Sequence, residues 1–331
     1  MPETKTTIGN SIAGLLVLSL VGCGGDHGPH EKYYLLASNI KLPYWQAAAA
    51  GLRQAARQIQ VSAEMVGPDT YDPKQQQLEL KKLIQRKPAG IMVSAADPEL
   101  IRADIDAAVA AGIPVITMDS DAPASKRLVF VGTNNYQAGV MGGEVAARLL
   151  HGKGNIVFLT MPGQLNLIER LNGYKFVLAQ HPQIKISEIV DIRGDPVAAF
   201  ETAKNLLEKT NPRVDAFICL EAIAGKEVAE VLDRNKATDR TVVAMDTDEG
   251  TLEWVEKGRI AATIAQKPFT MAFQGLKLLD DLRHHHTPGA QTSSAQDTRT
   301  RLPSIVDTGA TLIDKTNLEA FRQAGAGVKS P

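Results

Sequence analysis

The sequence predicts an α/β fold built from two similar halves, each with a parallel sheet. From Tyr33 onward, short apolar runs alternate with stretches of helical periodicity, which is the pattern of parallel α/β architecture. The alternation starts again after residue 135, so the chain divides most simply into two halves of about one ordinary domain each. With 331 residues and 44% hydrophobic content, the chain is long enough for both.

Each strand expected in the first half is a short run of buried-type residues. These strands cover residues 33–37, 61–66, 89–93, 113–118 and 128–132. The helices between them cover residues 44–60, 74–86 and 98–111. Their ends carry Gly or Pro signals, such as Lys87-Pro88 and Ala111-Gly112, which support these boundaries.

The second half repeats the same order of helix and strand. Helices are expected at residues 136–150, 165–180, 197–209, 222–234 and 249–256. Strands are expected at residues 155–160, 184–190, 214–220, 241–245 and 260–265. A helix at 269–283, a strand-like segment at 302–307 and a short helix at 317–323 follow, so the chain crosses between the halves more than once.

The N-terminus has the order of regions found in a secretory signal. Lys5 precedes an apolar run at residues 12–21, which is too short to cross a bilayer as a helix. The tetrapeptide Leu20-Val21-Gly22-Cys23 resembles a bacterial lipobox, which favours a cleaved lipoprotein signal over an uncleaved anchor helix. We therefore expect a signal peptide at 1–22, a lipidated Cys23 and a polar tether at 23–32.

Composition excludes several classes of function. A formal net charge of −1 argues against nucleic-acid binding, which needs a basic patch or stripe. Two cysteines are too few for a disulfide scaffold, and Cys219, in an apolar strand, is expected to be an inert buried thiol. The histidines at 27, 30 and 284–286 could bind a transition metal, but solvated surface is the favoured reading. We expect no metal and no cofactor.

Polar side chains follow many of the expected strands. These residues are Ser38, Asp119, Thr133, Asn134, Glu221, Asp246 and Gln266. In open α/β sheets, ligands bind beyond the carboxyl ends of the strands. Tyr44 and Trp45 lie close behind the first strand, and Arg170 lies on a helix of the second half. Carboxylates, amides and Arg hold sugar hydroxyls, while aromatic planes pack on the C–H faces of a sugar ring. The set predicts a pocket for a sugar-like ligand.

Capping and turn formation are the alternative for each of these residues taken alone, because Asp and Asn often cap helices after strands. Tyr44 and Trp45 could likewise be core residues at a helix start. The ligand hypothesis rests on the coincidence across many strands, and capping does not explain Gln266 or Arg170.

The chain resembles the periplasmic sugar-binding proteins of the ribose-binding type, whose fold also occurs in the effector domains of LacI-type repressors. The matching segments occur in family order over essentially the whole chain after the signal. They are Ser38-Asn39-Ile40-Lys41-Leu42-Pro43-Tyr44-Trp45, Ile113-Pro114-Val115-Ile116-Thr117-Met118-Asp119, Gly132-Thr133-Asn134-Asn135, Glu169-Arg170-Leu171-Asn172-Gly173-Tyr174, Met245-Asp246 and Ala261-Ala262-Thr263-Ile264-Ala265-Gln266-Lys267-Pro268.

This resemblance implies two Rossmann-like lobes with parallel sheets, joined by a three-segment hinge, as in the type I periplasmic binding protein fold. The N-terminal lobe would comprise residues 33–133 and 267–300, and the C-terminal lobe residues 134–266 and 301–331. Hinge crossings would fall near Thr133-Asn134, near Gln266-Lys267 and just before Leu302.

The resemblance also implies roles for the site residues. Tyr44 and Trp45 would stack on the ligand ring, with Ser38 and Thr133 nearby. Hydrogen bonds to the ligand hydroxyls would come from Asp119, Arg170, Asp246 and Gln266.

Three positions depart from the family pattern. Ribose binders commonly have Asn where this chain has Glu221, Asn where it has Leu42, and an aromatic residue where it has Met245. The ligand could therefore be another monosaccharide, a polyol or a furanose-like signal molecule, and Lys41 could compensate for Leu42. Three carboxylates facing one Arg disfavour an anionic ligand.

The leading hypothesis is a monomeric, lipid-anchored solute-binding protein of an ABC importer. It would lie in the periplasm or on the outer face of the cell envelope and close around a sugar or polyol. A ligand-sensing domain that feeds a receptor is the alternative. A repressor would need an N-terminal helix-turn-helix, which the sequence lacks at that place. A hydrolase is disfavoured because no nucleophile elbow, P-loop or metal-ligand spacing is present.

Overall fold

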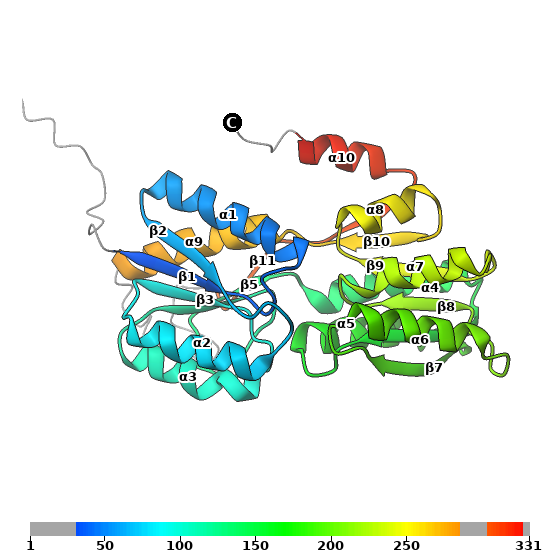
Figure 1. The fold of residues 1–331 in the computed structure, drawn as a ribbon, viewed down its shortest axis with the longest axis horizontal. Coiled ribbons are helices and arrows are strands. Elements are labelled where there is room, and N and C mark those ends of the chain that lie inside the picture. Colours follow the sequence, from blue (N-terminus) through cyan, green and yellow to red (C-terminus); the bar gives the residue numbers. More distant parts are fainter. Residues whose placement is uncertain (1–30, 285–302, 327–331) are drawn as a thin grey trace, which may run out of the picture.

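The computed structural model describes residues 31–284 and 303–326, which form two lobes lying side by side (Figure 1). Each lobe has one six-stranded sheet with helices on both faces. The expected signal peptide, Cys23, nearly all of the tether and residues 285–302 lie outside the described residues. The α/β fold with two mostly parallel sheets, as predicted, is confirmed.

The sheet of the first lobe has the order β11-β5-β4-β3-β1-β2, and all its pairings are parallel. Its strands are β1 (Lys32–Leu36), β2 (Ser62–Val66), β3 (Gly90–Val93), β4 (Val115–Met118), β5 (Phe130–Gly132) and β11 (Ile305–Asp307). Its helices are α1 (Pro43–Ile59), α2 (Pro73–Gln85), α3 (Pro98–Ala110) and α9 (Pro268–His284). Helices α1 and α9 cover one face, and α2 and α3 cover the other.

The sheet of the second lobe repeats this order as β12-β10-β9-β8-β6-β7. Its strands are β6 (Lys153–Thr160), β7 (Gln183–Asp191), β8 (Ala216–Cys219), β9 (Thr241–Met245), β10 (Ala262–Ala265) and β12 (Thr311–Asp314). Its helices are α4 (Asn135–Leu149), α5 (Leu165–Leu178), α6 (Pro196–Glu208), α7 (Ala224–Arg234), α8 (Glu249–Glu256) and α10 (Leu318–Ala326). Only β12, the strand not foreseen from the sequence, pairs antiparallel in this sheet as described.

Strand β1 shows why the short apolar runs form strands buried on both faces. Successive side chains of a strand point to opposite faces of the sheet. Tyr33 and Leu35 therefore enter the core beneath α1 and α9, whereas Tyr34 and Leu36 enter the core beneath α2 and α3. An uninterrupted apolar run satisfies both cores at once, as is typical of parallel sheets covered by helices.

The chain crosses between the lobes at residues 133–134, 266–267 and 308–310, between the strands and helices of different sheets. The third crossing differs from the prediction, which placed it before Leu302 and assigned residues 301–331 to the second lobe. Strand β11 instead pairs with β5 of the first lobe, and only β12 and α10 join the second. Backbone hydrogen bonding of Ile305–Asp307 along β5 holds this segment in the first sheet.

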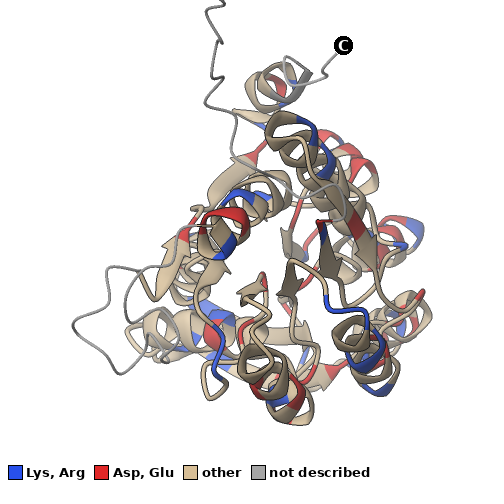
Figure 2. Cartoon of the chain, turned by 90° about the vertical axis from the view of Figure 1, so that its left-hand side faces the viewer, with Lys and Arg blue, Asp and Glu red and all other residues tan. Residues whose placement is uncertain are grey.

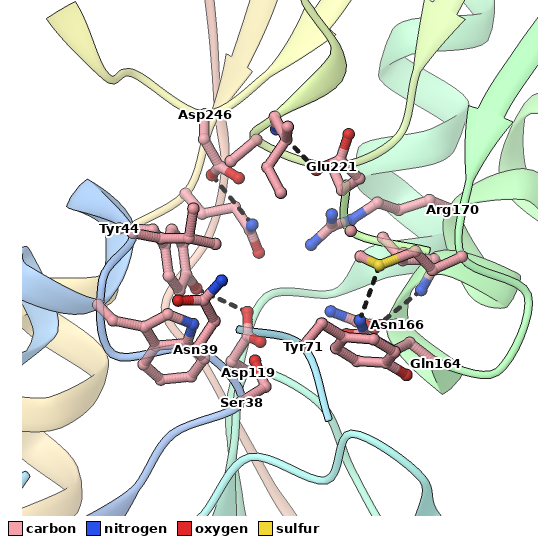
Figure 3. A pocket seen from close by; sticks show the side chains of 18 residues that line it. Ser38, Asn39, Tyr44, Tyr71, Asp119, Gln164, Asn166, Arg170, Glu221 and Asp246 are labelled. Atoms are coloured by element: carbon pink, nitrogen blue, oxygen red, sulfur yellow. Dashed lines mark hydrogen bonds between the residues drawn. The ribbon is translucent and has the colours of Figure 1, made fainter. Parts of the chain in front are cut away.

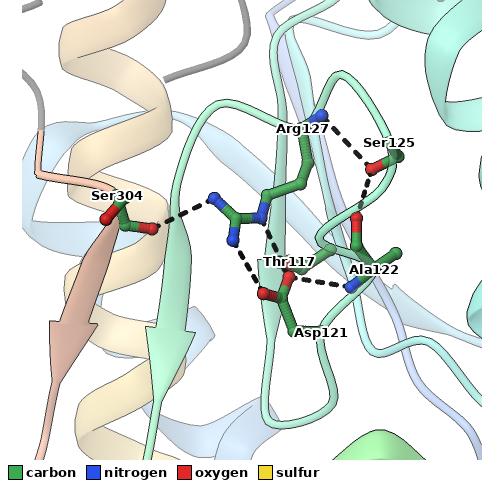
Figure 4. Close-up of polar contacts among 6 residues, drawn as sticks. All are labelled: Thr117, Asp121, Ala122, Ser125, Arg127 and Ser304. Carbon is green, nitrogen blue, oxygen red and sulfur yellow. Dashed lines mark hydrogen bonds and ion pairs between the residues drawn. The ribbon is translucent and has the colours of Figure 1, made fainter. Parts of the chain in front are cut away.

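A buried ion pair holds the start of β11 (Figure 4). Arg127 Nε and Nη2 donate to the two carboxylate oxygens of Asp121 at 2.9 and 2.7 Å. Arg127 Nη1 donates to the carbonyl of Ser304 at 3.0 Å. Because these groups are nearly enclosed, the returning chain is fixed against the loop between β4 and β5.

The third crossing is also tied to the first. Thr308 N donates to Gly132 O at 2.7 Å, and Asn134 N donates to Asp307 Oδ1 at 3.0 Å. The two crossing segments therefore run side by side as one hinge unit.

Charges of both signs are spread over the helices of the first lobe in the end-on view of Figure 2. Neither sign dominates that face. Among the described residues, no helix is both long and apolar enough to span a membrane.

Candidate functional site

A cleft lies between the facing carboxyl ends of the two sheets (Figure 3). It encloses about 520 Å³, including its opening to solvent, which is the size range of small-molecule sites. Of the nine predicted site residues, eight line it. They are Ser38, Tyr44, Trp45, Asp119, Arg170, Glu221, Asp246 and Gln266. The structure thus brings together residues that lie as much as 228 positions apart, from Ser38 to Gln266.

Asp119 and Asp246 occupy equivalent places in the two lobes. Asp119 follows β4 and Asp246 follows β9, which are the third strands of their sheets counted from β11 and β12. Both adopt a left-handed backbone, with φ of 68° and 65°. Such a conformation is uncommon and costly for a residue other than Gly, and it clusters at functional sites. The same strained conformation at equivalent places in both lobes supports a functional role for these two turns.

Asp119 is bound by residues of its own lobe. Its carboxylate accepts hydrogen bonds from Tyr44 Oη at 2.6 Å and from Ser94 Oγ at 3.2 Å. Burial raises the pKa of Asp119 above its ordinary value, against the opposing effect of these hydrogen bonds and of Arg170. The Tyr44 hydroxyl is therefore already engaged, and Tyr44 positions Asp119 in addition to lining the cleft.

Trp45 is only 2% exposed and packs edge-on against Tyr44, with ring centroids 5.3 Å apart. It belongs to the core beneath α1 and α9 while lining the cleft. In the sequence analysis, core packing and ligand stacking were alternatives for Trp45. In the structure, its indole belongs to the hydrophobic core and also forms part of the cleft wall.

Asp246 and Gln266 form a pair on the opposite side. Gln266 Nε2 donates to Asp246 Oδ1 at 3.0 Å, while Gln266 Oε1 is buried without a partner among the described residues. Burial raises the pKa of Asp246 to about 6, and Arg170 and Gln266 limit that rise. An unpaired buried amide oxygen is costly, so this site is prepared for a donor from a ligand.

Two of the three guanidinium nitrogens of Arg170 have hydrogen-bond partners in the protein, and the third has none among the described residues. Its Nε donates to Asn135 Oδ1 at 2.8 Å, and its Nη1 donates to Leu220 O at 2.7 Å. Its Nη2 is buried and has no partner in the described parts of the chain. Figure 3 shows the guanidinium reaching into the cleft, where Nη2 can donate to a ligand oxygen.

Tight packing of α4 on α5 fixes the position of Arg170. A Cβ on Gly139 would lie 2.0 Å from Arg170 O, and one on Gly173 would lie 2.1 Å from Tyr136 O. Only glycine permits this approach, so the crossing sets the depth of the guanidinium.

Glu221 combines the two roles that the sequence analysis gave as alternatives, ligand binding and helix capping. Its two carboxylate oxygens accept from Ile223 N at 2.6 Å and Ala224 N at 2.8 Å, at the start of α7. Burial nevertheless raises its pKa to about 7. Glu221 therefore fixes the beginning of α7 while it also lines the cleft.

Thr133 is the predicted site residue that does not line the cleft. It is buried, and its carbonyl accepts from Asn135 Nδ2 at 3.0 Å. Asn135 in turn holds Arg170, so Thr133 supports the site through two successive hydrogen bonds. Lys41 also lies outside the cleft, where it forms an exposed ion pair with Asp69 at 3.6 Å instead of compensating for Leu42.

Several lining residues were not predicted. The polar ones are Asn39, Tyr71, Gln164 and Asn166. Asn39 directly follows Ser38, and Gln164 and Asn166 flank the start of α5 after β6, so a wider search around strand ends would have found all three. Tyr71 lies in the loop between β2 and α2, five residues after the end of β2, and no local signal indicates that it contacts the second lobe.

Tyr71 contacts both lobes. Its hydroxyl donates to Ala96 O of its own lobe at 2.8 Å, while its ring packs on the core of the second lobe. A Cβ on Gly194 would lie 3.0 Å from Tyr71 Cβ, so a glycine leaves just enough room for this contact.

A cluster of possible metal ligands lies at the C-terminal end of α9, in the first lobe. His284 Nε2 is 2.9 Å from Glu31 and 3.7 Å from Asp280. All three side chains are partly exposed to solvent. His285 and His286, like His27 and His30, lie outside the described residues.

Comparison with known proteins gives consistent matches. A family model described as a periplasmic binding protein domain matches residues 33–285. The chain is 24% identical over 255 residues to the ribose import binding protein of Bacillus subtilis, covering 76% of this chain and 81% of that protein.

Solved structures extend the similarity to the fold. The arabinose-binding protein AraP of Geobacillus stearothermophilus is 34% identical, with a TM-score of 0.72 over 88% of this chain and 99% of that one. A solute-binding protein of Burkholderia graminis in complex with D-arabinose is 27% identical, with a TM-score of 0.79 over 87% of this chain and 96% of that one.

Proposed function

The chain belongs to the periplasmic binding protein domain family, and we propose that it binds a neutral monosaccharide or polyol in the interlobe cleft as the solute-binding protein of an ABC importer. One observation carries this proposal. Among the residues that the structure describes, Arg170 Nη2 and Gln266 Oε1 are buried without partners, in the same cleft as Asp119 and Asp246, whose backbones are strained. The cleft therefore offers both a donor and an acceptor beside fixed negative charge.

The hydroxyl group matches this arrangement because it donates one hydrogen bond and accepts others. Hydroxyls can donate to Asp119, Asp246 and Gln266 Oε1, and one can accept from Arg170 Nη2. Charged partners make such hydrogen bonds stronger than neutral ones. An anionic ligand would meet three carboxyl groups and one guanidinium in a site of low polarity, so neutral ligands are favoured.

The remaining wall suits the C–H faces of a sugar. Leu42, Trp45, Met161, Leu167 and Ile223 supply apolar surface around the polar groups. The relatives named for ribose and arabinose bind pentoses, which supports a ligand of about that size. Those relatives are named as binding proteins, which supports a role without catalysis.

Closure of the two lobes around the ligand would create the surface that a permease recognises. The contact of Tyr71 with the second lobe is consistent with lobes that meet across the cleft. The protein would act as a monomer, outside the cytoplasmic membrane.

Anchoring through Cys23 is a separate part of the proposal, because it depends on the N-terminal sequence alone. The Cys23→Ser variant should move from the membrane fraction to the soluble fraction of the native host. The lipobox assignment fails if the variant stays with the membranes.

A thermal-shift screen of the purified protein against pentoses, hexoses and polyols tests the central proposal. A ligand that binds only the folded form raises the free energy of unfolding by mass action, by about 2.7 kcal/mol at a hundredfold excess over Kd. Tm rises with it. At least one sugar or polyol should raise Tm in a saturable way. The proposal fails if none does while sugar phosphates or amino acids do.

A further inference from the structure

A second cavity adjoins the ligand cleft, beside the starts of α1, α7, α8 and α9. It also encloses about 520 Å³. The residues that line it but not the cleft are Pro43, Ala47, Lys226, Thr247, Asp248 and Pro268. This volume, which includes the opening to solvent, adds room beyond the cleft for a ligand larger than a free pentose.

The two cavities have a common wall. The residues that line both are Leu42, Tyr44, Ala222, Ile223, Asp246 and Gln266. A molecule held by Asp246 in the cleft can therefore extend past Leu42 and Ile223 into the second cavity. The apolar side chains at this passage favour a substituent with little hydrogen-bonding capacity.

The chemistry of the second cavity differs from that of the cleft. Pro43, Ala47 and Pro268 give it an apolar wall. Its charged groups already have partners, because Lys226 Nζ lies 3.7 Å from Asp248 Oδ1 and Asp248 Oδ2 accepts from Thr251 Oγ1 at 2.6 Å. None of the six residues particular to this cavity has a buried polar atom without a partner. Apart from Gln266, which the two cavities share, the second cavity has no buried polar group prepared to bind the hydroxyls of a second sugar as Arg170 is in the cleft.

We propose that the second cavity receives the aglycone of a glycoside whose sugar occupies the cleft. The inference rests on the proposed sugar-binding function and narrows its ligand class to O-glycosides with a neutral, apolar substituent. An aromatic or alkyl aglycone would pack on Ala47 and the two prolines and gain affinity by burying apolar surface.

Calorimetry with matched ligands tests this inference. The probes are D-ribose, D-arabinose, D-xylose and D-galactose, each as free sugar, methyl glycoside and p-nitrophenyl glycoside in both anomers. For the sugar that binds, we expect one p-nitrophenyl anomer to bind about tenfold tighter than its methyl counterpart, because it buries additional apolar area.

Filling the cavity should remove this gain alone. In Ala47→Trp the indole would occupy the aglycone space, so the p-nitrophenyl glycoside should lose its advantage while the free sugar keeps its affinity. Ala47→Leu is a smaller change that should lower the advantage in the same direction, should the tryptophan variant fail to fold. Gln58→Trp adds an indole at an exposed position near the end of α1 and should preserve the wild-type difference.

The possible outcomes distinguish failure of the aglycone inference from failure of the proposed sugar-binding function. If free sugars bind and every p-nitrophenyl glycoside binds no better than its methyl counterpart, the inference is overturned and the proposed function stands. If the advantage persists undiminished in both Ala47 variants, the aglycone lies elsewhere and the inference is overturned. If no free sugar or glycoside of the panel binds, while a polyol does, the glycoside inference is overturned and solute binding stands.

Discussion

At the scale of single residues, the cleft keeps three carboxyl groups where burial opposes their charge. Asp119, Glu221 and Asp246 all have raised pKa values, with burial as the largest cause, although Arg170 acts against it in each case. Asp119 and Asp246 also have strained backbones. Without a ligand these features cost stability, and hydroxyl donors from a bound sugar would offset part of that cost.

The pH dependence of stability follows from these shifts. The pKa of Glu221 rises from 4.5 to about 7 and that of Asp246 from 3.8 to about 6. At pH values between the unfolded-state pKa and the folded-state pKa of each group, the folded state binds more protons than the unfolded state. The free energy of unfolding therefore falls as pH rises. The stability that the two protonated carboxyl groups contribute is fully present below their unfolded-state pKa values. It is lost as pH rises through their folded-state pKa values. The Tm of the ligand-free protein should therefore fall between about pH 5 and about pH 8.

Asp246→Asn identifies the source of this dependence. Removing the buried charge should raise the free energy of unfolding at about pH 8 by roughly 1–3 kcal/mol, since one pKa unit corresponds to about 1.4 kcal/mol. The Tm profile should become flatter, and sugar affinity should fall by about tenfold or more, as expected for losing a charged acceptor. Urea unfolding at several pH values measures the first effect and calorimetry the second. An unchanged pH profile would contradict the assigned role of Asp246.

Residues that act through local features could be predicted from the sequence. Asp119, Asp246 and Gln266 end apolar runs, and in a parallel sheet such ends converge. The capping of α7 by Glu221 and the use of the Tyr44 hydroxyl on Asp119 depend on side-chain directions that a linear pattern does not contain. The contact of Tyr71 with the second lobe could not be predicted, because it joins segments more than a hundred residues apart.

At the scale of elements, the strands and helices were predictable and their partners were not. Nearly every strand and helix expected in the described chain is present, with ends shifted by a few residues. Strand β11 has only three residues, and its pairing with β5 depends on Arg127 reaching Ser304. No local sequence pattern connects Arg127 with Ser304, so the prediction from the sequence assigned the β11 segment to the wrong lobe.

The Arg127→Met variant tests whether the ion pair between Arg127 and Asp121 holds β11 in place. Removing Arg127 leaves the largely enclosed Asp121 carboxylate without a cation, with only the hydrogen bonds from Thr117 Oγ1 and Ala122 N. This should lower the free energy of unfolding by about 3 kcal/mol, the lower end of the range for breaking a buried pair. The double variant Arg127→Met/Asp121→Leu should recover part of that loss, because no unpaired charge remains. Denaturant titration measures both. Equal stability of Arg127→Met and the wild type would rule out this role.

The contact between Tyr71 and Gly194 tests closure at the element scale. Gly194→Ala places a methyl group against Tyr71, so the lobes should be held apart and sugar affinity should fall by about tenfold. Gly258→Ala is the matched control, because Gly258 has φ of 76° against 66° for Gly194 and a Cβ there would meet nothing within 4 Å. Both variants should lose similar stability from the left-handed backbone. If both lose affinity equally, or neither does, the contact has no role in binding.

At the scale of the whole molecule, the repeated lobes explain why the cleft exists. Two sheets of the same strand order face each other with their carboxyl ends, and three crossings join them on one side. Equivalent positions in the two lobes then supply Asp119 and Asp246, so one ligand is held from both sides. Opening and closing about the crossings leaves each sheet and its cores intact.

Calorimetry of the wild type with Asp246→Ala and Gln266→Ala tests the central claim most directly, using the sugar or polyol that raises Tm most. We predict one binding site per chain in the wild type. Each variant should lose about a hundredfold or more in affinity, because a buried charge-assisted or amide hydrogen bond to the ligand is lost and its partner is left unsatisfied. Far-ultraviolet circular dichroism should show that both variants are folded. Unchanged affinity in both folded variants would contradict the assignment of this cleft as the binding site.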